Sequence, residues 1–311
     1  MTEPIIHTEQ LSRNFGAVKA VDGLSLDVPA GIVFGFLGPN GAGKTTTIHL
    51  LLGLLEPTHG QARVLGYDTR TQSDAIHAHC GALLEFSGLY ERMSAEDNLD
   101  LYGRINRMPA PERRARIKEL LTHLELWERR KELVGKWSRG MKQKLAVARS
   151  LIHRPPLVFL DEPTAGFDPQ AAAALHKDLT SLVEREGVTV FLNTHNLVEA
   201  EKLCARVGVI RAGKLLTVGS PDELRGSKGA SQAEIIGHGF SEQILSLLKA
   251  HPEVAQVELQ NNHLCIDLRD GDEIAPLVSL IVAAGGQIEE IRRGKASLEE
   301  VFLTLMEEDK K

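Results

Sequence analysis

The sequence predicts an α/β fold with a mainly parallel sheet, followed by a smaller α+β domain. Three largely apolar runs, residues 32–37, 157–160 and 188–192, are typical of strands that are buried on both faces. Helical patterns separate these runs, and such alternation of buried strands with helices favours a parallel sheet. After residue 226 the pattern changes to short strands and helices of a different order, which indicates a second domain.

Two further features complete the expected first domain. Residues 5–9 and 24–28 alternate apolar and polar side chains, as half-buried strands do, and we expect them in an N-terminal antiparallel sheet. From about residue 87 to 153, apolar residues recur at helical spacing among many charges, which predicts an inserted helical subdomain. Its arginines fit either a basic patch for nucleic acid or a solvated face, and the interleaved acids favour the solvated face: Glu112, Glu119, Glu125 and Glu128.

The predicted domain boundaries follow from a Gly/Ser-rich stretch. We assign residues 1–226 to the first domain, residues 227–231 to a linker and residues 232–311 to the second domain. The order of elements expected in the second domain is βαββαβ, which is the ferredoxin-like pattern. A last helix is expected to begin at a capping box that runs from Ser297 to Glu300.

Composition restricts the class of protein. The 311 residues are 42% hydrophobic and 25% charged, values that are ordinary for a globular protein with a real core. The net charge of -6 argues against a nucleic-acid partner, and three scattered cysteines form neither a disulfide framework nor a zinc site. Because we find no signal peptide and no apolar run of roughly 20 residues, we expect a cytoplasmic protein that docks on another chain's membrane helices.

The first chemical motif is a phosphate-binding loop between a buried strand and a helix that we expect from Lys44 to Leu55. It fits the pattern G-x-x-x-x-G-K-[ST], in which backbone N–H groups and the helix N-terminus face phosphates. Lys44 is expected to reach the β- and γ-phosphates, and the Thr45 hydroxyl to bind Mg²⁺. The predicted nucleotide-binding residues are Gly38, Pro39, Asn40, Gly41, Ala42, Gly43, Lys44, Thr45 and Thr46.

The second motif is a pair of acids at the end of a buried strand. Asp161 and Glu162 follow the apolar run 157–160. Two carboxylates in such a place are costly unless a cation or another partner compensates them. We therefore expect Asp161 to hold the Mg²⁺ of bound ATP, and Glu162 to polarise the attacking water.

With these motifs in order, the chain resembles the ATP-binding cassette (ABC) family. Residues 137–144 are similar to the signature sequence of that family, usually written L-S-G-G-Q. The resemblance implies that Ser138, Arg139, Gly140 and Met141 face the ATP bound by the other subunit of a head-to-tail dimer. Ser138 is also expected to cap the following helix.

The same resemblance implies roles for three further residues. Asp168 matches the D-loop and is expected at the dimer interface, while His195 matches the switch histidine near the γ-phosphate. Phe15 matches the aromatic residue that stacks on adenine. The C-terminal residues 296–302 look like the accessory domain of cassettes that serve ABC-2-type and multidrug exporters.

The sequence departs from the family pattern at three positions. Glu85 occupies the place of a common glutamine, and we predict that it contacts Mg²⁺ or its water and couples the site to the membrane partner. Arg139 replaces a glycine, with a side chain directed either to the interface or to solvent, and Met141 replaces a glutamine.

The function implied is ATP hydrolysis that drives a separate membrane permease. Two ATP molecules are sandwiched between this cassette and either a second copy or a related chain, at the cytoplasmic face of the membrane. Two alternatives stay open: a cassette ATPase of translation or repair, and the ATPase of an importer. The single cassette and the missing heptad run disfavour the first, while Glu85, the form of the signature and the accessory domain favour export by resemblance.

Overall fold

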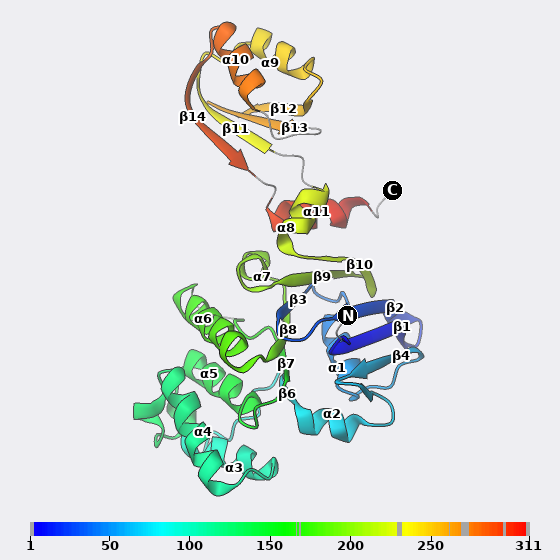
Figure 1. Cartoon of the computed structure of the whole chain (residues 1–311), viewed down its shortest axis with the longest axis vertical. Helices are drawn as coiled ribbons and strands as arrows, with labels where there is room; N and C mark the ends of the chain where they lie inside the picture. The colour runs from blue at the N-terminus through cyan, green and yellow to red at the C-terminus, as the bar shows by residue number, and fades with distance from the viewer. Residues whose placement is uncertain are drawn as a thin grey trace. The chain divides into compact units, whose positions relative to one another are not determined.

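The computed structural model describes residues 3–308, apart from Gly166, Asp168, 229–231, 261, 269–273 and 295–296. The chain divides into two compact units, residues 1–218 and residues 219–311 (Figure 1). The predicted linker overlaps the end of helix α8 (Pro221–Lys228), and its residues 229–231 lie outside the described part of the chain.

The mainly parallel sheet of the first unit has six strands in the order β10-β9-β3-β8-β7-β6. β3 pairs in parallel with β8 and β9, and β7 pairs in parallel with β6 and β8. The carboxyl ends of β3, β7 and β8 therefore meet at one edge of the sheet, where the predicted catalytic segments begin. The strands are β3 (Val33–Leu37), β6 (Cys80–Leu83), β7 (Leu157–Asp161), β8 (Thr189–Thr194), β9 (Arg206–Arg211) and β10 (Lys214–Gly219).

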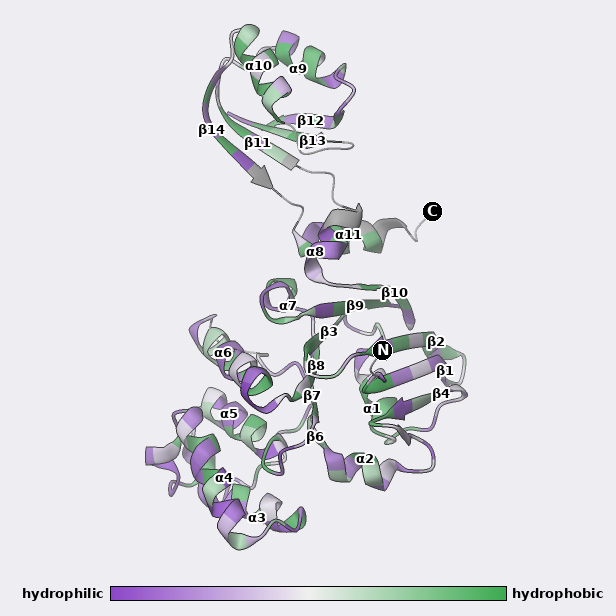
Figure 2. Ribbon diagram, in the orientation of Figure 1, coloured by the Kyte–Doolittle hydropathy of each residue, from purple (hydrophilic) through white to green (hydrophobic). Residues whose placement is uncertain are grey.

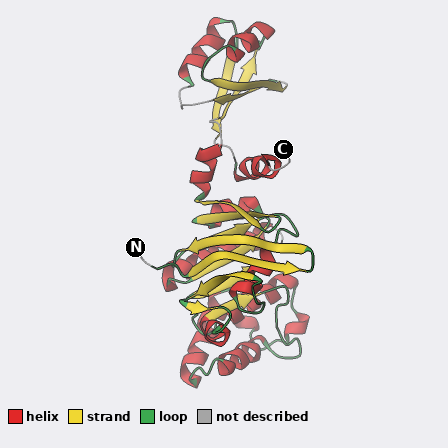
Figure 3. Cartoon of the chain, turned by 90° about the vertical axis from the view of Figure 1, so that its right-hand side faces the viewer, coloured by secondary structure: helices red, strands yellow, loops and turns green. Residues whose placement is uncertain are grey.

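A second, antiparallel sheet contains the N-terminal strands, as predicted. Its order is β2-β1-β4-β5, with antiparallel pairing throughout, and Figure 3 shows its long strands from the face. Thr8 and Leu11 of β1 are buried, whereas Glu9 and Gln10 are exposed, so one face packs on the core. The strands are β1 (Ile6–Phe15), β2 (Val18–Val28), β4 (His59–Val64) and β5 (Tyr67–Asp68).

Helices cover both faces of the parallel sheet. Figure 1 shows α5, α6 and α7 on one side, with α1 and the antiparallel sheet on the other. The central strands are coloured hydrophobic in Figure 2, and their core contains the Phe191 ring within 5.4–5.6 Å of three other phenylalanine rings: Phe34, Phe36 and Phe159. The helices are α1 (Lys44–Leu51), α2 (Ser73–His79), α5 (Arg139–Ser150), α6 (Pro169–Glu186) and α7 (Leu197–Leu203).

Helix α1 is shorter than its sequence pattern indicates. We expected a helix from Lys44 to Leu55, but it ends at Leu51. Gly53 has φ +67°, the left-handed conformation that commonly terminates a helix. The apolar pattern continues beyond Gly53 because Leu55 still packs on the core, although the backbone is no longer helical.

The helical subdomain consists of α3 (Ala95–Ile105), α4 (Ala110–His123) and α5, with short 3₁₀ turns at Trp127–Arg129 and Val134–Lys136. The expectation that its arginines form a solvated face is wrong for two of them. Arg113 is buried against Asp100 at 2.5 Å, and Arg116 is only 2% exposed. The Arg116 guanidinium donates to both carboxylate oxygens of Glu186 on α6, at 2.6 and 2.9 Å, so it anchors the subdomain to α6.

The second unit contains a four-stranded antiparallel sheet in the order β12-β13-β11-β14, which is the ferredoxin-like arrangement predicted for βαββαβ. Helices α9 (Glu242–Lys249) and α10 (Ala275–Ala283) supply apolar residues to its core. Helix α11 (Leu298–Glu308) begins at the predicted capping box: the Glu300 amide donates to Ser297 Oγ, and the Ser297 amide donates to the Glu300 carboxylate. The strands are β11 (Gln232–His238), β12 (Val254–Gln260), β13 (His263–Leu268) and β14 (Gln287–Gly294).

Candidate functional site: a phosphate-binding loop with two acids

The loop between β3 and α1 borders a cavity of about 480 Å³. Two of its glycines are sterically required: a Cβ on Gly38 would lie 2.3 Å from the Ile210 carbonyl oxygen, and one on Gly43 would lie 2.2 Å from that of Ala20. Gly43 also has φ +103°, which side chains rarely allow. Several residues of the loop and α1 line the cavity together with Asp161, Glu162 and Asn193: Asn40, Gly41, Ala42, Gly43, Lys44, Thr45 and Thr46. The N–H groups of the first helical turn have no acceptor within the helix and suit an anion.

The Lys44 amine occupies the base of this loop. Nζ donates to the carbonyl oxygens of Gly38 at 2.7 Å and Pro39 at 3.1 Å. Burial lowers the pKa of Lys44, while the carboxylates of Glu162 and Asp161 act in the opposite direction. The amine is thus held between the loop and both acids, where a phosphate oxygen can replace a carbonyl as its partner.

Asp161 links three elements at the edge of the sheet. Its Oδ2 accepts a hydrogen bond from the Thr45 hydroxyl at 3.0 Å, and its Oδ1 accepts one from the Asn193 amide. Asn193 lies directly opposite Asp161 in the register of β7 and β8. Sequence analysis gave Asn193 no role, although a polar residue near the end of an apolar strand is a usable signal.

Glu162 and His195 form a pair across the cavity edge. His195 Nδ1 lies 2.8 Å from both carboxylate oxygens of Glu162. Glu162 has φ 49°, an uncommon conformation for a residue with a side chain, and its amide donates to the Asn193 carbonyl at 2.9 Å. The structure therefore brings together Lys44, Thr45, Asp161, Glu162 and His195, five residues to which the sequence analysis assigned roles at the site.

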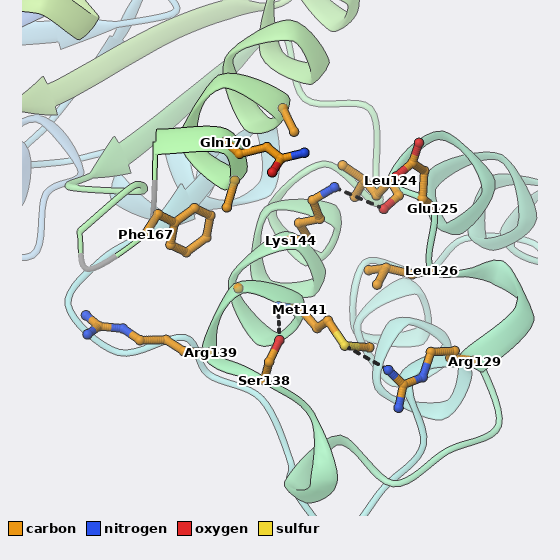
Figure 4. Close-up of a pocket in the computed structure, with 13 residues that line it drawn as sticks. Leu124, Glu125, Leu126, Arg129, Ser138, Arg139, Met141, Lys144, Phe167 and Gln170 are labelled. Atoms are coloured by element: carbon orange, nitrogen blue, oxygen red, sulfur yellow. Dashed lines mark hydrogen bonds between the residues drawn. The ribbon is translucent and has the colours of Figure 1, made fainter.

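The predicted signature residues line a separate cavity of about 630 Å³, shown in Figure 4. Ser138 caps α5 as expected, since its Oγ accepts from the Met141 amide at 3.3 Å. Arg139 is exposed, and the Met141 sulfur accepts from Arg129 Nη1 at 3.2 Å. A Cβ added to Gly140 would find no atom closer than Phe167 Cζ at 4.0 Å. Within the described part of the chain, no neighbouring atom therefore requires a glycine at this position.

Among the described residues predicted at the nucleotide site, some do not line the cavity: Gly38, Pro39, His195, Phe15 and Glu85. Phe15 ends β1 with 46% of its surface exposed, and the Arg13 guanidinium lies 4.7 Å from its ring centroid. Glu85 is exposed, two residues beyond β6. Asp168 lies outside the described residues.

Comparisons with known proteins agree with this geometry. Residues 21–165 match the family model described as "ABC transporter", and residues 219–306 match that of the "ATP-binding protein DrrA1-3-like, C-terminal domain". The "Daunorubicin resistance ATP-binding protein DrrA3" of Streptomyces coeruleorubidus is 34% identical over 100% of this chain and 98% of its own length. The "Bacitracin transport ATP-binding protein BcrA" of Bacillus licheniformis is 34% identical over 97% of each chain.

Solved structures give the same result for the fold. An "ATP binding subunit of ABC transporter" superposes with a TM-score of 0.66 at 29% identity, covering 72% of this chain and 92% of its own. The ADP-bound cassette MJ1267 superposes with a TM-score of 0.64 at 26% identity, covering 71% and 93%. The chain therefore belongs to the ATP-binding proteins of ABC transporters, and it is an ATPase whose hydrolysis of ATP is coupled to transport.

Proposed function

We propose that the cavity binds Mg-ATP, with the phosphate loop and Lys44 around the triphosphate and Phe15 beside the adenine. This proposal depends on one observation: Lys44, Thr45, Asp161 and Glu162 line the same cavity. The Thr45 hydroxyl and the Asp161 carboxylate lie 3.0 Å apart and form the kind of oxygen pair that suits Mg²⁺. When bound, the ion would neutralise charge on the phosphate oxygens.

In this proposal Glu162 is the base that orients and polarises the attacking water. Its carboxylate lies at the carboxyl end of β7 beside the cavity and is held by His195. His195 is 61% exposed on its side chain, so it is accessible to a γ-phosphate as well as to Glu162. His195 thereby links the presence of the γ-phosphate to the position of the base.

A variant of Glu162 tests this assignment. We expect Glu162→Gln to lower ATP hydrolysis by at least about a hundredfold, because an amide is a poor proton acceptor. With Mg-ATP this variant should accumulate as a dimer, measured by light scattering after size exclusion. Glu184→Gln, the same change at an exposed site of α6, is the matched control. Hydrolysis at the wild-type rate by Glu162→Gln would exclude this role.

We infer that a second copy or a related cassette completes the site in trans. Ser138 and Arg139 are exposed, and the space in front of Gly140 is open to Phe167 at 4.0 Å. A glycine that the described part of its own chain does not need is explained by a ligand that approaches the backbone closely. Asp168 is expected to belong to the same interface.

The same inference extends to a separate permease. Within the described part of the chain, no helix is long and apolar enough to cross a membrane. A cavity of about 330 Å³ between the core and the helical subdomain has exposed apolar residues at its rim, Leu54 at 50% and Ile105 at 61%. Such a groove suits an apolar cytoplasmic segment of a membrane partner, which would place the chain at the cytoplasmic face of the membrane.

A charge placed in this groove tests the docking. Ile105→Asp should release the chain from membranes that contain its partner, while the ATP affinity of the purified chain stays unchanged. Leu303→Asp, at a 55% exposed position of the second unit, is the control. Retention of Ile105→Asp on the membrane would contradict the assignment.

Export is the direction we propose. The relatives named for daunorubicin resistance and bacitracin transport match the chain over its full length, including the second unit. A "Nod factor export ATP-binding protein I" of a Rhizobium species is 36% identical over 98% of the chain.

The prediction that Glu85 contacts Mg²⁺ or its water stays open: unchanged ATPase and transport in Glu85→Ala would rule it out.

A further inference from the structure

A buried carboxylate lies behind the catalytic pair, on helix α7. Glu199 is 1% exposed, and its side chain is fully buried. Among the described residues, three side chains contact it: the Thr164 hydroxyl is 3.1 Å from both oxygens, the Thr194 hydroxyl donates at 2.8 Å and His176 Nε2 donates at 2.6 Å. A buried carboxylate is costly unless it is hydrogen-bonded, and these three donors offset that cost.

The partners of Glu199 come from the segments that hold the reacting residues. Thr164 lies two residues after Glu162, and Thr194 directly precedes His195. His176 belongs to α6. The carboxylate therefore ties both catalytic segments and α6 to one point, and Glu199 is not among the residues that line the nucleotide cavity.

The capping arrangement at the start of α7 leaves the Glu199 carboxylate available to accept hydrogen bonds from the two threonines. Asn196 caps the helix and accepts from the Glu199 amide at 3.1 Å. In an ordinary capping box the acid three residues on would accept from the amide of the capping residue. Here the Asn196 amide donates instead to the Thr194 hydroxyl at 3.1 Å, so the Glu199 side chain turns to the two threonines.

The backbone at Glu162 explains why such an anchor is useful. Its φ of 49° is an uncommon conformation that persists only where the surroundings fix it. The Ala165 amide donates to the Glu162 carbonyl at 3.1 Å, and the Thr164 hydroxyl fixes the same turn to Glu199. On the opposite segment, the Thr194 bond fixes the residue beside His195.

We infer that Glu199 is a positioning residue for ATP hydrolysis. It holds Thr164 and Thr194 so that Glu162 and His195 stay 2.8 Å apart. The inference depends on the roles of Glu162 and His195 proposed above. Glu199 touches neither the nucleotide cavity nor the water, so its effect falls on the rate of the chemical step and not on ATP binding.

Steady-state kinetics of the purified full-length chain test this inference. Glu199→Gln replaces one acceptor oxygen by an NH₂ group, so it cannot keep all three donors. We expect kcat to fall at least about tenfold and the KM for ATP to stay within about twofold. Glu184→Gln should leave both unchanged, and thermal unfolding should show that Glu199→Gln is folded at the assay temperature.

The threonines supply the second measurement. Thr164→Val and Thr194→Val remove one hydroxyl each at nearly constant shape, and each should lower kcat while leaving the KM for ATP unchanged. Because Thr164 acts through Glu199, the double variant that combines Glu199→Gln with Thr164→Val should be no slower than Glu199→Gln alone. If Glu199→Gln does not fold, the kcat and KM of the two threonine variants decide the question.

Several results would overturn the inference. One is a wild-type kcat in Glu199→Gln, or in both Thr164→Val and Thr194→Val. Another is a KM for ATP that rises as kcat falls. The last is a double variant of Glu199→Gln and Thr164→Val in which the two losses of kcat multiply. Glu162→Gln, assayed in parallel, distinguishes a failure of the proposed base from a failure of the inference about Glu199. If Glu162→Gln keeps its rate, the proposed base is wrong; if Glu162→Gln loses its rate and Glu199→Gln does not, only the role of Glu199 fails.

Discussion

Replacing Gly140 by alanine should make the protein more stable and less active at once. Gly140 lies in the first turn of α5, and a new Cβ would meet nothing closer than Phe167 Cζ at 4.0 Å. Alanine is favoured over glycine within helices by about 0.5–1 kcal/mol. For a unit of this size, 1 kcal/mol raises the unfolding temperature by about 2–4 °C, which sets the upper limit of the expected gain.

The same methyl group should obstruct the partner subunit's triphosphate. We expect Gly140→Ala to lower ATP hydrolysis at least about tenfold, equivalent to about 1.4 kcal/mol, and to weaken the ATP-dependent dimer of the Glu162→Gln chain. Binding of ATP to the monomer should not change, because Gly140 does not line the nucleotide cavity. The assays are thermal unfolding, light scattering with Mg-ATP and ATP titration of the monomer.

Gly103 of α3 is the matched control. A Cβ there would lie 2.4 Å from Arg113 Cδ, and Asp100 and the Met108 carbonyl fix that arginine. Gly103→Ala should therefore destabilise the chain by about 1–3 kcal/mol, although it is also a helical glycine. The reasoning is refuted if Gly140→Ala lowers the unfolding temperature, or if it forms the dimer and hydrolyses ATP like the wild type.

Two further predictions concern stability. Arg116→Ala leaves the Glu186 carboxylate without its bidentate partner, so we expect the free energy of unfolding, measured with denaturant, to fall by about 3–5 kcal/mol. Arg114 is exposed on the same helix, and Arg114→Ala should change this free energy little. Equal losses in the two variants would refute the role of Arg116 as an anchor. The pKa of His7 is raised by hydrogen bonds to Asp27 and then Glu9. Its stabilisation is therefore complete below the usual pKa of about 6.5 and is lost as pH rises through the folded pKa. The unfolding temperature of His7→Gln should fall below that of the wild type in acid and match it in alkali; a gap that widens in alkali would contradict the assignment.

The sequence alone was sufficient for the elements whose signal is local. Apolar runs predicted β3, β7 and β8, and the order of elements predicted the ferredoxin-like second unit. The phosphate loop and the acids at 161–162 were found because each motif is continuous in the chain. Arg116 was misinterpreted because its partner, Glu186, lies 70 residues away, and periodicity does not show which charges become paired on folding.

Glu199 is a clearer case of the same limit. The pattern Asn196-x-x-Glu199 predicts a capping box, and half of one is present. Which way the carboxylate turns depends on Thr164 and His176, and only folding brings these two residues to α7. Asn193 was missed for a related reason, since its contact with Asp161 depends on the register between β7 and β8.

The proposed site has two halves: the first is the phosphate loop with Asp161 and Glu162, and the second is the signature segment. They differ in how firmly the rest of the chain holds them. Buried or partly buried hydrogen bonds within one chain fix Lys44, Asp161 and the turn after Glu162. The signature half is exposed at Ser138 and Arg139, and the contacts that order it include the Ser138 cap, the Arg129–Met141 contact and the Lys142–Glu91 ion pair. A cassette that must bind ATP before it meets its partner needs the first half preformed. It also needs a second half that separates without breaking buried contacts, and an exposed Ser138 beside an uncrowded Gly140 meets that requirement.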